Sequence, residues 1–265
     1  MAPWMLMWAT AGSLYAGCKW LSYRDARGRG VAANGRALAY LLLWPGMDAD
    51  AFLFPRARVA RPASSEWLAA ALKTMLGLAL TWVVARTVLP IRTLLAGWVA
   101  MTGLIFVLHF GTFHLLSLVW RAAGVDAAPI MKNPLRAESL ADFWGRRWNT
   151  AFHVLADRFA FRPLRSRVGV IGATLGAFLA SGLIHELVIS VPARGGYFLP
   201  TAYFLIQGLA VCAERTRTGR RLGLARGWRG WLFTVAVTAG PAFWLFPPVF
   251  VRNVVLPMLK EIGAV

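Results

Sequence analysis

Six long apolar stretches most constrain how this chain of 265 residues can fold. A helix that crosses the hydrocarbon core of a bilayer needs roughly 20 mostly apolar residues. The stretches that meet this requirement are residues 4–21, 67–85, 94–119, 168–191, 198–213 and 231–251. The sequence therefore predicts an all-α, polytopic transmembrane helix bundle of about six spans. We expect one integral-membrane domain over residues 1–265.

The composition is typical of a membrane protein. Hydrophobic residues make up 58% of the chain, charged residues make up 15%, and the mean hydropathy is +0.56. A net charge of +18 would suit a nucleic-acid binder, but such proteins keep a charged, soluble body that this chain lacks. We therefore expect no nucleic-acid partner. Cys18 and Cys212 lie in apolar runs, which predicts neither a disulfide framework nor a CxxC metal site.

One further apolar segment, residues 37–54, is interrupted by Pro45, Gly46, Asp48 and Asp50. Backbone breaks and carboxylates are poorly tolerated where a helix faces lipid. We predict that this segment forms re-entrant or interfacial helices rather than a span.

The basic residues predict a topology. Three alternate loops, residues 23–66, 121–167 and 214–229, hold 22 of the 29 Lys and Arg residues. Cytoplasmic loops are enriched in Lys and Arg, so these three loops should face the cytoplasm and both termini should face outward. For a bacterial protein the membrane would be the inner, cytoplasmic one.

The second of these loops contains the sequence DFWGRRWN, residues 142–149. Ser139, with an acidic residue three positions later, predicts the start of a helix. An apolar face is formed by Leu140, Phe143, Trp144, Trp148, Ala151 and Leu155, and a polar face by Asp142, Asn149 and His153. This spacing predicts one amphipathic helix with a polar stripe.

The aromatic and basic side chains of this helix have two interpretations. Trp and Arg commonly anchor a surface-lying helix to lipid head groups, which requires no catalysis. Within the apolar face, Arg147 either extends to head groups or stacks on Trp144 or Trp148.

A second informative stretch, FLASGLIHELVIS, covers residues 178–190 of the fourth predicted span. Ionisable side chains are expensive inside a membrane unless they are paired or face a cavity. Ser181 and Gly182 share a helical face with His185 and would let another segment or a ligand approach it closely. The alternative is a neutral histidine that is hydrogen-bonded to a neighbouring helix.

Other chemistries for His185 have weaker support. The pair His185-Glu186 opens like an HExxH zinc motif, but no second histidine follows. His109 and His114 are five residues apart and do not share a helical face, so we expect no metal. Ser181 could pair with His185 as a nucleophile, but no accompanying acid or oxyanion site is recognisable.

Two patterns together resemble the wax synthase branch of the membrane-bound O-acyltransferase family. They are P-x4-S-L-x2-F-W-x2-R-W-N over residues 134–149 and S-G-x2-H-E over residues 181–186. The resemblance covers about residues 131–190, the motif core. It implies transfer of an acyl group from a thioester, typically acyl-CoA, to a hydroxyl inside the membrane. The family's proposed catalytic histidine corresponds to His185, and its conserved polar residue corresponds to Asn149.

The residues are chemically suited to these roles. An alcohol is a poor nucleophile until its proton is removed, and the neutral imidazole of His185 can accept that proton. The amide of Asn149 can donate to the thioester carbonyl or orient the reacting groups. No metal or redox cofactor is expected, and acyl-CoA is counted as a co-substrate.

Acyl-CoA also has phosphates that need partners. The candidate substrate-binding residues are Trp144, Arg146, Arg147, Trp148 and Ser181, and Lys132 and Arg136 of the same loop could also meet the phosphates. Positive-inside topology alone would equally account for most of these basic residues.

Other functions remain open at this level. The acceptor could be a fatty alcohol, or the hydroxyl of a sterol, glycan or secondary metabolite, with acetyl-CoA as a possible donor. A lipid or small-molecule transporter would line a polar path with Asn149, His153 and His185. A non-enzymatic membrane protein would use the aromatic helix only as an anchor. Membrane lipids are partners in every case, and the sequence identifies no oligomer or protein partner.

Overall fold

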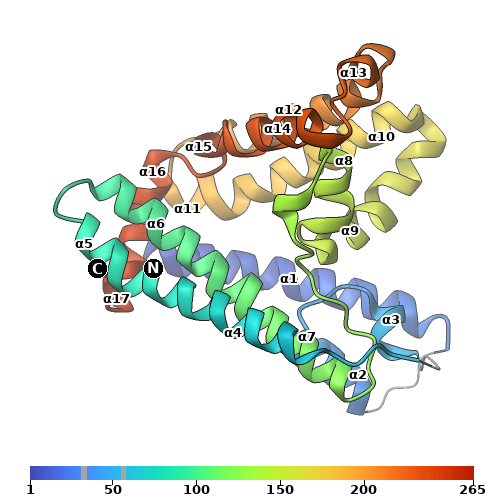
Figure 1. Cartoon of the computed structure of the whole chain (residues 1–265), viewed down its shortest axis with the longest axis horizontal. Helices are drawn as coiled ribbons and strands as arrows, with labels where there is room; N and C mark the ends of the chain where they lie inside the picture. The colour runs from blue at the N-terminus through green and yellow to red at the C-terminus, as the bar shows by residue number, and fades with distance from the viewer. Residues whose placement is uncertain (31–34, 55–57) are drawn as a thin grey trace. The chain divides into compact units, whose positions relative to one another are not determined.

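The computed structural model describes residues 1–30, 35–54 and 58–265, and the elements in these ranges are all helices (Figure 1). The chain forms two compact units, which are described separately. Unit 1 comprises Met1–Ala11 and Lys132–Val254, and unit 2 comprises Gly12–Met131 and Val255–Val265. The expectation of a single domain stays a prediction.

Unit 2 contains most of helix α1 (Pro3–Arg27), which begins in unit 1. Its other elements are α2 (Gly35–Leu43), α3 (Ala49–Leu53), α4 (Ser64–Ala79), η1 (Leu80–Val84), α5 (Ala85–Val88), α6 (Thr93–Ile105), η2 (Phe106–Thr112), α7 (Phe113–Ala122) and α17 (Leu256–Glu261). The elements η1 and η2 are π-helical turns that continue their neighbours.

The predicted interruption of residues 37–54 is present. Helix α2 ends at Leu43, and α3 begins at Ala49 with Asp48 as its N-cap, whose carboxylate accepts the N–H of Ala51 at 3.0 Å. Helices of nine and five residues are too short to cross a bilayer. The break supports a non-spanning segment, and its re-entrant or interfacial placement stays a prediction.

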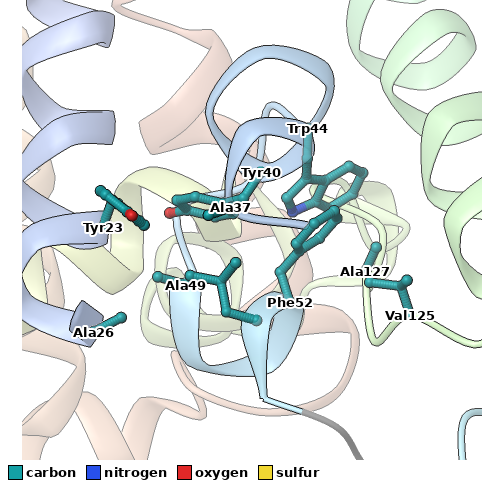
Figure 2. Packing of buried hydrophobic residues seen from close by; sticks show 10 residues of the cluster. Tyr23, Ala26, Ala37, Tyr40, Trp44, Ala49, Phe52, Val125 and Ala127 are labelled. Carbon is teal, nitrogen blue, oxygen red and sulfur yellow. The ribbon is translucent and has the colours of Figure 1, made fainter. Parts of the chain in front are cut away.

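An aromatic cluster joins this segment to α1 within unit 2. Figure 2 shows Tyr40, Trp44 and Phe52 packed together, and the Phe52 ring centroid lies 5.6 Å from that of Tyr40. The ammonium of Lys19 on α1 lies 3.3 Å from the centroid of the Tyr40 ring and donates to the carbonyl of Gly46. These contacts give polar partners to the buried nitrogen of Lys19 and to a backbone carbonyl at the break.

Three described helices are long and apolar enough to cross a membrane: Ser64–Val88, Thr93–Ala122 and Thr150–Ala193. A fourth is counted if Gly227–Leu245 and Pro248–Glu261, which meet at a bend of 53°, form one span. These correspond to four of the six predicted stretches. The first stretch forms α1, which is not apolar enough to be counted, and the fifth forms a helix of only 17 residues.

Unit 1 holds the motif core. Its elements in chain order are η3 (Pro134–Arg136), α8 (Leu140–Asp142), η4 (Phe143–Arg147), α9 (Thr150–Ala156), η5 (Asp157–Phe161), α10 (Arg162–His185), η6 (Glu186–Ser190), α11 (Val191–Ala193), α12 (Leu199–Arg215), α13 (Arg217–Leu222), α14 (Gly227–Ala239), α15 (Ala242–Leu245), α16 (Pro248–Phe250) and η7 (Val251–Val255), which ends at the border with unit 2. Helices α10 and α12 pack side by side (Figure 1).

The helical conformation of α10 is interrupted close to the residue at which the fourth predicted stretch begins. Gly169 adopts φ 70° and ψ −177°, which interrupts the helical conformation. Glycine tolerates positive φ because it has no Cβ. The part of α10 after Gly169, together with η6, corresponds to the predicted stretch 168–191.

Candidate active site

The motif segment begins as the sequence predicts. Ser139 is the N-cap of α8, and its hydroxyl oxygen accepts the N–H of Asp142 at 3.0 Å. The helix continues without a break into the π-helical turn η4, which carries Trp144, Arg146 and Arg147. The start of the helix is therefore confirmed.

The prediction of one continuous amphipathic helix is wrong. The first helix ends at Arg147. Trp148 is extended with φ −98° and ψ 122°, and Asn149 then adopts a left-handed conformation with φ 44° and ψ 59°. The side-chain oxygen of Asn149 accepts the N–H of Phe152 at 3.3 Å, so Asn149 caps a second helix, α9. Asparagine is favoured in both situations because its short amide replaces a backbone partner. His153 and Leu155 thus belong to a different helix from Trp144.

The indole of Trp144 is held by α10 and α12. Its ring centroid lies 5.9 Å from that of Phe178 and 5.7 Å from that of Phe204. Its N–H donates to the side-chain oxygen of the fully buried Gln207 at 3.2 Å, and the amide nitrogen of Gln207 donates to the carbonyl of Val237 at 2.8 Å. This chain of hydrogen bonds leaves Trp144 one orientation.

His185 lies at the end of α10 with one ring nitrogen bound. Its Nδ1 is 2.7 Å from the carbonyl oxygen of Ser181. A carbonyl can only accept, so Nδ1 carries the hydrogen and Nε2 of the neutral imidazole keeps its lone pair. The ring also lies against Phe204, with centroids 4.4 Å apart. The partner in this bond is the backbone of Ser181, not the hydroxyl considered from the sequence.

Helices α10 and α12 approach closely beside His185. A Cβ at Gly182 would lie 2.8 Å from the Cα of Thr201, which is closer than side chains normally come. One carboxylate oxygen of Glu186 accepts both the N–H and the hydroxyl of Thr201, at 3.1 and 2.9 Å. The expected close approach at Gly182 is present, and it brings Phe204 to the imidazole.

A basic pocket of about 470 Å³ opens beside the motif segment. It is lined by Lys132, Arg136, Glu138, Ser139, Asp142, Arg146, Arg147 and Ala225. The four basic residues that the sequence suggested for phosphate binding thus line one pocket. Two carboxylates accompany them, which leaves the lining with an excess of positive charge.

Within this pocket Asp142 organises two arginines. Nε of Arg146 lies 3.0 Å from Oδ1 of Asp142, and Nε of Arg147 forms an ion pair with Oδ2. Arg147 also donates to the carbonyl of Asn133 at 3.4 Å. This pairing differs from both placements expected for Arg147. The remaining aromatic candidate, Trp148, stacks on Phe143 with ring centroids 5.5 Å apart.

The structure thus divides the predicted residues between two places in unit 1. Trp144, Ser181 and His185 belong to the aromatic site around Phe204, whereas Arg146 and Arg147 belong to the basic pocket. Asn149 lies at the junction of η4 and α9. The single turn η4 contributes residues to both places, with Trp144 in the aromatic site and Arg146 and Arg147 in the basic pocket.

Sequence reasoning missed three residues of α12: Phe204, Gln207 and Glu214. Gln207 and Glu214 are buried polar side chains, and their positions within or just after the fifth predicted stretch were the available signal. Phe204 carried no signal, because it is one of many aromatic residues in apolar runs.

No group of three or more His, Cys, Asp or Glu side chains in the described ranges is arranged to hold a metal ion. His109 and His114 lie in η2 and α7 of unit 2, and His153 lies in α9 of unit 1. The histidines therefore give no geometry for a zinc site among these residues.

Comparisons with known proteins agree with the motif residues. Residues 127–206 match the sequence model of the Membrane bound O-acyl transferase family. The long-chain-alcohol O-fatty-acyltransferase of Simmondsia chinensis is 34% identical over 144 residues, which cover 49% of this chain and 40% of that protein. The probable long-chain-alcohol O-fatty-acyltransferase 7 of Arabidopsis thaliana is 31% identical over 147 residues, covering 49% and 42%.

A relative whose name gives a sterol as the acceptor is the acyl-CoA–sterol O-acyltransferase 1 of Arabidopsis thaliana, 30% identical over 159 residues that cover 53% of this chain and 44% of that protein. The chain thus spans less than half the length of these curated relatives. The matched segment contains both motifs together with Phe204 of α12. Residues 127–206 therefore match this family over both motifs, and the resemblance of the chain to its wax synthase branch is confirmed.

Proposed function

We propose that this chain transfers a fatty acyl group from acyl-CoA to the hydroxyl of a long-chain alcohol. The observation that carries the proposal is the bond between Nδ1 of His185 and the carbonyl of Ser181, which leaves Nε2 as a base inside the matched segment. The relatives named as long-chain-alcohol acyltransferases favour a fatty alcohol. The relative named as a sterol acyltransferase makes a sterol hydroxyl the second candidate acceptor.

The proposed step begins at Nε2 of His185. The imidazole takes the proton of the alcohol as its oxygen attacks the thioester carbonyl, and a C–O bond forms. The tetrahedral intermediate collapses by breaking the C–S bond, and the departing thiolate takes the proton back from the imidazolium. The N–H at Nδ1 donates to the carbonyl of Ser181 throughout, which keeps Nε2 directed at the reacting hydroxyl.

Asn149 is proposed to assist through its amide. Donation to the thioester oxygen would stabilise the negative charge that develops there, a contribution that is worth about a hundredfold or more in rate for comparable groups. Its left-handed backbone and its capping bond to Phe152 hold the side chain at the junction of two helices. Such a fixed position costs little reorganisation during the reaction.

The basic pocket is proposed to bind the phosphates of acyl-CoA. Lys132, Arg136, Arg146 and Arg147 supply cationic donors, which form stronger hydrogen bonds to phosphate than neutral groups do. The turn η4 joins this pocket to Trp144, so one segment would hold both the phosphate end and the acyl end of the donor. Trp144 and Trp148 would shape the cytoplasmic mouth of the site.

We also propose that α1 and α12 cross the membrane, which would give six spans with both termini outward. Helix α12 has 17 residues and is about 26 Å long, slightly less than a hydrocarbon core of about 30 Å. The proposal is supported by the alternation of basic loops, which would put the basic pocket on the cytoplasmic side. Single cysteines are placed on either side of each helix, at Ala2 and Gly28 for α1 and at Gly195 and Arg217 for α12, and are labelled from either side of sealed vesicles; labelling of both members of a pair from the same side would overturn the proposal.

The function is tested by ester formation in membranes that contain the full chain. Labelled palmitoyl-CoA is supplied with hexadecanol, a sterol or no acceptor, and products are separated by mass. The wild type should form a wax ester with hexadecanol, and His185→Ala should form none at equal protein level. Glu261→Gln, an exposed change in unit 2, serves as the matched control. Absence of ester from every donor and acceptor would overturn the proposal.

A further inference from the structure

Helix α12 contacts the motif segment at two levels. Near its middle, Phe204 and Gln207 hold the indole of Trp144. Two turns later, the carboxylate of Glu214 accepts the N–H of Leu140 at 2.8 Å and that of Ala141 at 2.9 Å. Glu214 is 1% exposed, so water does not substitute for these bonds.

The first N–H groups of a helix have no partner inside it and must be satisfied from elsewhere. In α8 the donors of Leu140 and Ala141 go to Glu214, and the donor of Asp142 goes to Ser139. A negative charge at a helix N-terminus is also favourable. Glu214 and Ser139 therefore complete the start of the helix that carries Trp144.

The other end of α12 is fixed next to His185. Thr201 contacts Gly182 closely and donates twice to Glu186, the residue after the imidazole. From Thr201 to Glu214 the helix rises about 20 Å, and it is uninterrupted over that length. A rigid element thus joins the two motifs, which lie far apart in the sequence.

We infer that Glu214 is a positioning residue, which holds the motif segment on α12 so that Trp144 and the basic pocket keep a fixed place relative to His185. The inference rests on the proposed function. Glutamate suits this role because both oxygens accept, whereas glutamine offers one acceptor and turns an N–H₂ group toward the second donor. Loss of one bond should leave a backbone N–H unsatisfied and loosen the segment.

The test compares wild type, Glu214→Gln and the control Glu261→Gln as purified full chains in lipid nanodiscs. Hydrogen–deuterium exchange is followed in peptides that cover residues 138–148, and ester formation is measured over a range of acyl-CoA concentrations. In Glu214→Gln, exchange at residues 140 and 141 should be about ten- to a hundredfold faster. The kcat should fall about tenfold, and the protection of α10 should not change.

Each outcome decides part of the inference. Unchanged exchange at residues 140 and 141 would show that the hydrogen bonds to Glu214 do not hold the segment in place. Faster exchange with an unchanged kcat overturns the positioning role, and loss of protection throughout unit 1 shows that Glu214 is needed for folding instead. If the wild type forms no ester, both the proposed function and the positioning role are wrong. The exchange data still show in that case whether Glu214 holds the N–H groups of Leu140 and Ala141.

Discussion

Nδ1 of His185 lies 2.7 Å from the carbonyl oxygen of Ser181, one helical turn earlier, and this bond leaves Nε2 as the ring nitrogen that can accept a proton. Because the backbone makes the bond, Ser181→Ala should keep ester formation within a few-fold of wild type. His185→Ala should lower the rate by about a hundredfold or more, since it removes the proposed general base. Rates per amount of protein in membranes measure both. A loss in Ser181→Ala as large as that in His185→Ala would instead favour a serine nucleophile.

Asn149 combines a cap with a proposed catalytic amide, and one substitution separates the two. Aspartate also tolerates the left-handed conformation and caps helices, but it has no N–H to donate. Asn149→Asp should therefore keep the melting temperature near that of wild type and lower the rate about a hundredfold. Thermal unfolding and ester formation are measured on the same preparation. An unaltered rate would leave Asn149 with a structural role only.

The sequence was most informative where a local pattern has a local cause. Ser139 was recognisable as an N-cap, the break near Pro45 was visible, and the motif residues around Trp144 and His185 pointed to the family whose model matches residues 127–206. The prediction of one continuous helix was wrong because Asn149 was assigned to a polar face. Its side chain instead accepts the N–H of Phe152 and caps a new helix. Periodicity does not report such local competition.

The contributions of α12 could not be predicted, because they depend on tertiary contacts. Glu214 meets Leu140 across 74 positions of the chain, and no spacing rule connects them. Gln207 was visible only as a polar residue in an apolar run, and its partner Trp144 was not identifiable. The basic pocket likewise required the fold, since Lys132 and Arg147 are separated by the start of the motif helix.

Gly182 allows α12 to approach His185, and a larger residue should separate the two helices. The Cβ of Gly182→Ala would lie 2.8 Å from the Cα of Thr201, so the variant should lose about 1–3 kcal/mol of stability and part of its activity. Gly12→Ala in α1 meets nothing within 4 Å and should be neutral or slightly stabilising. Thermal unfolding of both variants checks this. Equal stability of the two would contradict the close packing.

The indole N–H of Trp144 should contribute to the stability of the fold separately from the packing of its ring. Trp144→Phe leaves the side-chain oxygen of Gln207 buried without a donor, which should cost about 1–3 kcal/mol. Trp228→Phe, at a position that is 70% exposed, is the matched control and should cost much less. Chemical denaturation in detergent measures the stability of both variants, and ester formation by the folded proteins measures their activity. If the control were equally destabilised, the hydrogen bond would not be the cause.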